Sequence, residues 1–244
     1  MKINLQRLSI LAVFATIPVV ASFAAVPAIY WDSNLGTAGV GGTGTWVSTS
    51  STKNWATTTA GTTNSNWSNT NTQAIFDGTA GTVTVSNSAT PVLAAPTDII
   101  VNVTGYTLNF NNVSLAGMGT LALNAVSGET IIDFGSAVTA TSLVFTDSSA
   151  VSWASGTILT IVNYSTAANT LKFGTTSSGL TPTQLSEIRF ETSPGVYSAA
   201  GINASGFVSA IPEPATTVML GAAAVLGFVV YQRRRPTAAV STNS

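Results

Sequence analysis

The sequence of 244 residues predicts an all-β repeat architecture for the middle of the chain, either a β-solenoid or a β-sandwich. From residue 73 onward, short runs rich in β-branched residues alternate apolar and polar side chains, which is typical of strands with one buried face. Gly, Asn, Ser or Thr bounds each run, and the runs follow one another at close, regular spacing. Only 7% of the residues are charged, against about 25% in ordinary soluble domains.

The alternation and the turn residues between the runs define the predicted strands. Residues 82–85 read Thr-Val-Thr-Val, and the pair Asp77-Gly78 before them is a common turn sequence. The predicted strands are residues 74–76, 82–85, 99–103, 106–110, 121–123, 131–134, 143–145 and 158–162.

A short helix is predicted late in this region. Thr181 is a suitable N-cap, Pro182 takes the first helical position, and Gln184 stands three residues after Thr181, which together make a capping box. Residues 187–190 then lead into another strand, and residues 206–208 form the last one.

The N-terminal residues 1–24 have the organisation of a secretory signal peptide. Lys2 and Arg7 precede an apolar stretch over residues 8–20, and Ser22 and Ala24 provide small side chains for cleavage after Ala24. Cleavage after Ala28 is the second option. The signal peptide places residues 25–210 outside the inner membrane.

The C-terminal residues combine a proline-rich tripeptide, an apolar segment and a basic cluster. Pro212, Glu213 and Pro214 resist helix formation, because proline lacks a backbone N–H and fixes φ. Residues 215–231 carry no charge and, as a transmembrane helix, would rise about 25 Å. Positive charge favours the cytoplasmic side, so we expect residues 236–244 to form a polar cytoplasmic tail behind the basic stop. That stop consists of Arg233, Arg234 and Arg235.

This order of parts resembles the PEP-CTERM sorting signal of Gram-negative bacteria over residues 211–235. The resemblance rests on Pro212, Glu213 and Pro214, the Ala/Gly/Val/Leu-rich span, and the arginines at 233–235. It implies recognition by an exosortase-type enzyme in the membrane, followed by display at the cell surface or in the extracellular matrix. The alternative is a plain C-terminal membrane anchor behind a proline-rich stalk.

Residues 44–110 resemble the autotransporter-associated β-strand repeat of bacterial surface proteins. The similarity lies in the order of Gly44-Thr45-Trp46, Asn54-Trp55, Trp67, residues 74–78, residues 81–85 and residues 105–108. It implies a right-handed parallel β-helix, in which each coil pairs with the next.

Three tryptophans, Trp46, Trp55 and Trp67, stand in the polar region before the first strands. One interpretation is that they cap the open end of the solenoid core, since an indole buries a large area and has a single N–H to satisfy. The other is that they stack on sugar rings, in which case Trp55 and Trp67 are the candidate glycan contacts.

Composition excludes several classes of site. The chain has no cysteine and no histidine, so it has no thiol nucleophile, no imidazole base and no zinc site of the usual N/S type. Residues 25–210 hold Lys53, Lys172 and Arg189 against eight carboxylates, so they lack the basic character of a nucleic-acid binder. We expect no cofactor and no metal.

Paired carboxylates are the enzymatic option that the composition leaves. Glu129 lies four residues before Asp133, and Glu187 and Glu191 flank Arg189. Glycoside hydrolysis needs two carboxyls about 5–10 Å apart. We expect Glu187 and Arg189 to form an exposed ion pair instead, and we predict no catalytic residue.

The sequence thus predicts an exported structural or adhesive protein of the cell surface or extracellular matrix. Its expected partners are an exosortase-type enzyme, the inner membrane until processing, and extracellular polysaccharide, with no nucleic acid. The alternatives are a carbohydrate-binding module and a polysaccharide-active β-helix enzyme.

Overall fold

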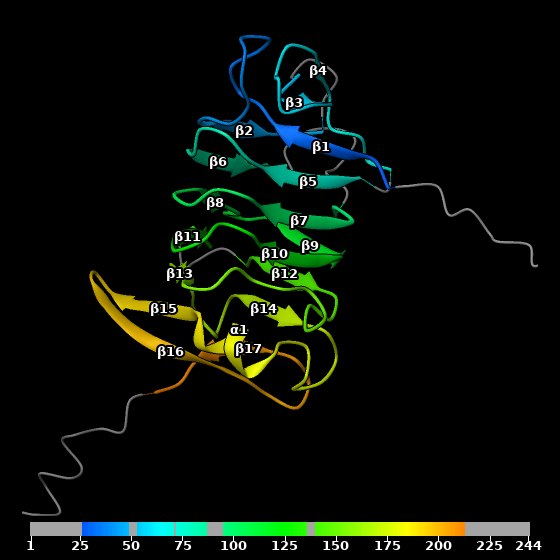
Figure 1. Ribbon diagram of the computed structural model, residues 1–244. Coiled ribbons are helices and arrows are strands. Elements are labelled where there is room, and N and C mark those ends of the chain that lie inside the picture. Colours follow the sequence, from blue (N-terminus) through cyan, green and yellow to red (C-terminus); the bar gives the residue numbers. More distant parts are fainter. Residues whose placement is uncertain (1–25, 49–52, 71, 87–94, 136–139, 213–244) are drawn as a thin grey trace, which may run out of the picture.

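The computed structural model describes residues 26–48, 53–70, 72–86, 95–135 and 140–212. Figure 1 shows a stack of short strands that rises coil upon coil along one axis, a β-solenoid of about four turns. The prediction of an all-β fold is confirmed. Of the two predicted architectures, solenoid and sandwich, the structure has the solenoid. The predicted signal peptide and the segment 215–231 lie outside the described residues. Within the described ranges, no helix has the length and apolar character needed to span a membrane.

Three sheets make the walls of the solenoid. The first sheet runs in the order β10-β7-β5-β1-β3-β4, the second in the order β17-β16-β15-β13-β11-β8-β6-β2, and the third in the order β14-β12-β9. The strands of the first sheet are β1 (Ala28–Trp31), β3 (Trp55–Ala56), β4 (Asn64–Ser65), β5 (Gln73–Phe76), β7 (Asp98–Val101) and β10 (Thr120–Leu123). Those of the second are β2 (Gly44–Trp46), β6 (Thr82–Val85), β8 (Thr107–Asn109), β11 (Gly128–Asp133), β13 (Thr157–Val162), β15 (Ile188–Ser193), β16 (Val196–Ile202) and β17 (Val208–Ala210). Those of the third are β9 (Ser114–Met118), β12 (Ser142–Phe145) and β14 (Thr170–Phe173).

Parallel register places apolar side chains of successive coils directly above one another. Successive side chains of a strand point to opposite faces, so every second one points inward. In parallel register, each inward position therefore repeats as a column along the stack. One column of the second sheet is fully buried and consists of Val83, Leu108, Ile132, Ile161 and Phe190. A matching column in the first sheet consists of Ile29, Ala74, Ile99 and Leu121.

Polar ladders hold the corners where strands end. Asn102 donates to a carboxylate oxygen of Asp77 at 3.0 Å and accepts from the amide of Asn124 at 3.0 Å. On the second sheet, Asp133 accepts from the amides of Asn109, at 3.0 Å, and Asn163, at 2.7 Å. Each side chain meets its counterpart in the next coil, so the Asn and Asp residues that bound the runs satisfy one another.

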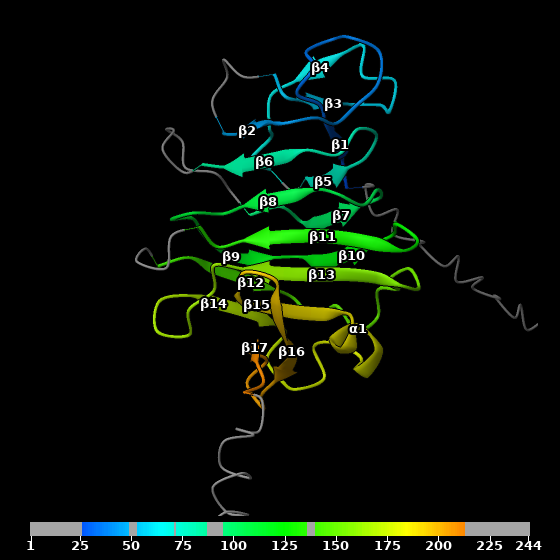
Figure 2. The same ribbon diagram turned by 90° about the vertical axis from the view of Figure 1, so that its left-hand side faces the viewer.

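Pairing is parallel in the body and antiparallel at both ends. At the N-terminal end β1, β3 and β4 pair antiparallel, and at the C-terminal end β15, β16 and β17 do so. Figures 1 and 2 show these hairpin-like layers at opposite ends of the stack. They cover the edges at which a parallel solenoid would otherwise present unpaired backbone groups to another chain.

The predicted short helix is confirmed as α1 (Pro182–Ser186). The backbone N–H of Gln184 donates to the Thr181 hydroxyl at 3.2 Å, and the N–H of Thr181 donates to the side-chain oxygen of Gln184 at 2.7 Å. The buried Gln184 amide also donates to the carbonyls of Ser148, at 2.9 Å, and Val151, at 2.7 Å. The helix is therefore fixed to the segment that follows β12.

The structure contains strands that the sequence pattern did not indicate. Strand β1 directly follows the apolar N-terminal region of the sequence. The alternation of apolar and polar residues in β1 is therefore hard to distinguish from the end of that apolar region. Gly117 interrupts the apolar pattern of β9, and β14 is a short run with Lys172 at an outward position. Only the register against β12 makes β9 and β14 part of a sheet.

Replacing Ile132 by Ala should lower the free energy of unfolding by about 2–5 kcal/mol, because the cavity lies inside a continuous apolar column. Ile131→Ala is the matched control, since Ile131 neighbours Ile132 on β11 but points outward and is partly exposed. Urea unfolding of both variants checks this. Equal losses would contradict the inward and outward assignment of β11.

Candidate functional site

The two tryptophans predicted to contact glycans lie inside the N-terminal end of the solenoid. The exposed fraction is 1% for Trp55 and 5% for Trp67. Trp46 packs against both, with ring centroids 4.7 Å from Trp67 and 5.0 Å from Trp55, and the Trp31 centroid lies 5.4 Å from that of Trp55. Most of these contacts are edge-to-face, the arrangement that aromatic pairs favour.

This four-indole cluster corrects the prediction that Trp55 and Trp67 stack on sugars. Stacking needs an accessible ring face, but both rings are buried against neighbouring indoles, and Trp55 also packs against Phe76. The capping interpretation agrees with the structure. Trp31, which sequence reasoning missed, is the fourth member, and its N–H donates to the Gly42 carbonyl at 2.8 Å.

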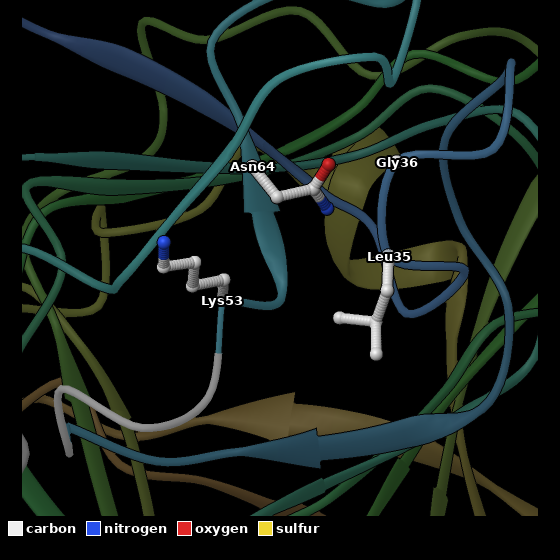
Figure 3. Close-up of a pocket in the computed structure, with 4 residues that line it drawn as sticks. All are labelled: Leu35, Gly36, Lys53 and Asn64. Carbon is white, nitrogen blue, oxygen red and sulfur yellow. The ribbon is translucent and has the colours of Figure 1, made fainter.

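A hollow of about 370 Å³ opens on the surface of the same end and is lined by Leu35, Gly36, Lys53 and Asn64. Figure 3 shows Lys53 and Leu35 on opposite sides of the space, with Asn64 between them. The Asn64 amide donates to the buried carboxylate of Asp32 at 2.8 Å. Among the described residues that line the hollow, Lys53 is the one titratable group, and the nearby Asp32 carboxylate is buried, so the hollow is suited to weak binding and not to proton transfer.

Arg189 pairs with Glu129, and not with Glu187 as predicted. Its guanidinium lies 2.8 Å from a Glu129 carboxylate oxygen, and its Nε–H donates to the Thr160 hydroxyl at 2.8 Å. The Tyr197 ring centroid lies 4.0 Å from the guanidinium carbon. The parallel register of β11, β13 and β15 brings these residues together across more than 25 positions of sequence, which spacing alone could not reveal.

The ion pair changes the acidity of Glu129. Partial burial raises the pKa of its carboxyl, but hydrogen bonds from Thr160 and Arg189, together with the positive charge of Arg189, outweigh this and leave the pKa below its usual value of 4.5. Asp133 is occupied by the Asn109 and Asn163 amides. Both members of the predicted Glu129–Asp133 pair are therefore bound into the scaffold. In the ranges that the structure covers, no three acidic side chains gather closely enough to hold a metal ion.

A second hollow, of about 210 Å³, lies beside α1 at the C-terminal end. Its wall includes Trp153, the one tryptophan that lies outside the N-terminal cluster, and Glu187, which caps the C-terminus of α1. Sequence reasoning did not select Trp153. Its isolation from the tryptophan-rich N-terminal region is the signal that could have identified it.

The residues of the predicted sorting signal lie almost wholly beyond the described ranges. Pro212 is exposed at the end of the fold, after Ile211 donates its N–H to the Ala199 carbonyl at 2.8 Å. Glu213, Pro214 and the arginines at 233–235 lie outside the described residues.

Comparison with known proteins found no matching family model, no matching curated protein and no matching solved structure.

Trp55→Ala should lower the free energy of unfolding by about 3–5 kcal/mol, because it empties the centre of the cluster. Trp55→Phe should cost much less, since it keeps most of the volume and removes an indole N–H that is buried without a partner. Trp153→Ala is the control at a partly exposed site. Urea unfolding that ranks Trp55→Ala no worse than Trp153→Ala would contradict the capping role.

The ion pair predicts a pH-dependent contribution to stability. Because the folded-state pKa of Glu129 is lowered, its contribution is present above the usual value of 4.5 and is lost as the pH falls through the folded-state pKa. The stability advantage of the parent over Glu129→Gln should therefore shrink between about pH 5 and pH 3. Urea midpoints at both pH values measure it, and a constant difference would show that the pair does not titrate with folding.

Proposed function

We propose that this protein is an exported, non-catalytic structural element of the cell surface or extracellular matrix. In this proposal a C-terminal sorting signal follows the β-solenoid and directs it there. The observation that carries the proposal is a capped, charge-poor stack whose carboxylates on β11 are bound into ladders and an ion pair. Such a body presents long polar walls on which Glu129 and Asp133 already have partners, a surface suited to cohesion and not to catalysis. We take the coil to be right-handed, as the repeat resemblance implies.

The start of the fold favours cleavage after Ala24 over cleavage after Ala28. Strand β1 begins at Ala28, which pairs with Gln73, and the Pro27 carbonyl accepts the Gln73 N–H at 2.9 Å. Cleavage after Ala28 would remove both contacts from the first coil. A signal peptide of residues 1–24 leaves β1 whole.

The end of the fold leaves Pro212, the first residue of the proposed sorting motif, exposed. Strand β17 finishes at Ala210, and the Ile211 N–H makes the last backbone contact before Pro212. Pro212, Glu213 and Pro214 then follow directly, with no intervening linker. An exosortase-type enzyme at the membrane would act on this tripeptide, while residues 215–231 hold the chain in the inner membrane and the arginines at 233–235 stay inside. Processing would release the solenoid to the surface layer.

Intact mass of the protein recovered from cells with and without the processing enzyme tests this route. With the enzyme, the chain should lose everything after the region of residues 212–214, because the basic stop and apolar segment remain with the membrane. Without it, the C-terminus should be complete.

The matched variants are Pro212→Ala combined with Pro214→Ala, which should block processing, and Pro236→Ala, a proline replacement outside the tripeptide, which should not. A complete C-terminus in both strains would contradict the sorting signal and would indicate a plain membrane anchor.

A further inference from the structure

Two hollows beside α1 at the C-terminal end of the solenoid share lining residues, and we refer to them together as the groove. It consists of the hollow of about 210 Å³ beside Trp153 and an adjoining hollow of about 490 Å³, which share Ser149 and Thr181. One wall of the first part is aromatic, and hydroxyl groups and a carboxylate make the remainder. Its polar side chains are Ser149, Ser152, Thr181, Thr183, Gln184 and Glu187.

We propose that this groove binds a neutral saccharide, with Trp153 as the stacking surface and Glu187 as a hydrogen-bond acceptor. This assignment is independent of the sorting of the chain. It transfers glycan contact from the buried N-terminal tryptophans to the partly exposed tryptophan at the opposite end.

Trp153 is held in a fixed orientation. Its indole N–H donates to the Leu121 carbonyl of β10 at 2.9 Å, and the ring packs against the core while still lining the groove. Because the N–H is already satisfied within the protein, the ring offers its apolar surface to a ligand. The apolar C–H face of a sugar ring is complementary to such a surface.

Glu187 presents an unused acceptor. It is the C-cap of α1, and its Oε2 atom is enclosed by protein and has no hydrogen-bond partner among the described residues. Desolvation raises the pKa of this carboxyl, although a backbone hydrogen bond from Gly156 acts in the opposite direction. A buried acceptor without a donor is costly. Because Oε2 is closed to solvent, a ligand hydroxyl would bond to the part of the carboxylate that lines the hollow.

The charge of the lining selects the class of ligand. The described residues that line the two parts of the groove include no Lys or Arg, and Glu187 would repel a uronate, sulfate or phosphate. Hydroxyl side chains can donate to and accept from sugar hydroxyls. A neutral, hydroxyl-rich ring fits these groups, whereas an acidic polysaccharide does not.

The size of the groove sets the length of ligand. The first part is smaller than the sites of about 300–1,000 Å³ that take drug-sized molecules, so it holds about one sugar ring. The adjoining part is more apolar, with Leu180, Pro182, Leu185 and Ile202, and it gives the next rings of a chain a place to lie.

The groove is built on rigid elements. The two hydrogen bonds from the Gln184 amide join α1 to the carbonyls of Ser148 and Val151, and the Ser148 hydroxyl accepts from the Leu121 N–H at 3.1 Å. Both walls are thus tied to each other and to β10 before a ligand arrives. Such preorganisation lowers the entropic cost of binding.

Titration calorimetry of the full chain with neutral hexasaccharides tests the proposal. The probes are cello-, malto-, laminari- and chitohexaose, with polygalacturonate as the anionic comparison. At least one neutral hexasaccharide should bind, and Trp153→Ala should weaken it at least about tenfold, equivalent to about 1.4 kcal/mol. Tyr197→Ala, which removes a partly exposed aromatic ring away from the groove, should leave the affinity unchanged.

Two further variants keep the result interpretable. Glu187→Gln should fold at least as well as the parent at neutral pH, because it removes a desolvated charge, and should weaken binding about threefold to tenfold. Trp153→Phe keeps an aromatic face in case Trp153→Ala fails to fold, and it should retain part of the affinity. The proposal is overturned if no neutral hexasaccharide binds, if polygalacturonate alone binds, or if both Trp153 variants bind as the parent does.

Discussion

In-register parallel stacking is the constraint on which the rest of this structure depends. Each coil is too short to bury its own apolar side chains, so columns such as Val83, Leu108 and Ile132 become a core only when neighbouring coils lie above and below. The same register aligns the corner residues, and Asp77, Asn102 and Asn124 therefore bond to one another without any ionic partner. Backbone ladders, apolar columns and amide ladders thus share one geometric origin, which explains how a chain without disulfides and with few charges holds together.

A stack of this kind must end, and both ends are closed by antiparallel layers. At one end the indoles of Trp31, Trp46 and Trp55 cover the last apolar column, and at the other α1 and the β15–β16–β17 layer do so. Large aromatic rings suit the first task, because they cover wide area with few polar atoms. Closed ends favour a solenoid of fixed length over an open polymer.

Because the chain has few charged residues, the surroundings of each carboxyl group matter for what the protein can bind. Glu129 is stabilised in its ionised form by Thr160 and Arg189, whereas Glu187 lies in a partly desolvated position with one oxygen unused. The two carboxyls have opposite roles: the first joins adjacent strands, and the second faces a groove beside Trp153. A structural body and a localised saccharide site can therefore coexist in one small domain, since they draw on different residues.

The sequence by itself determined the local features, namely the alternating strands and the Thr181–Gln184 capping box. These depend on neighbours within a few residues, so a linear pattern carries them. Tertiary structure alone decided which coil follows which, that Arg189 meets Glu129 and not Glu187, and that Trp55 and Trp67 are buried while Trp153 lines a groove. The physical reason is register. Residues some 20 to 60 positions apart become neighbours only when coils stack, and the exposure of an indole depends on whether another coil lies above it.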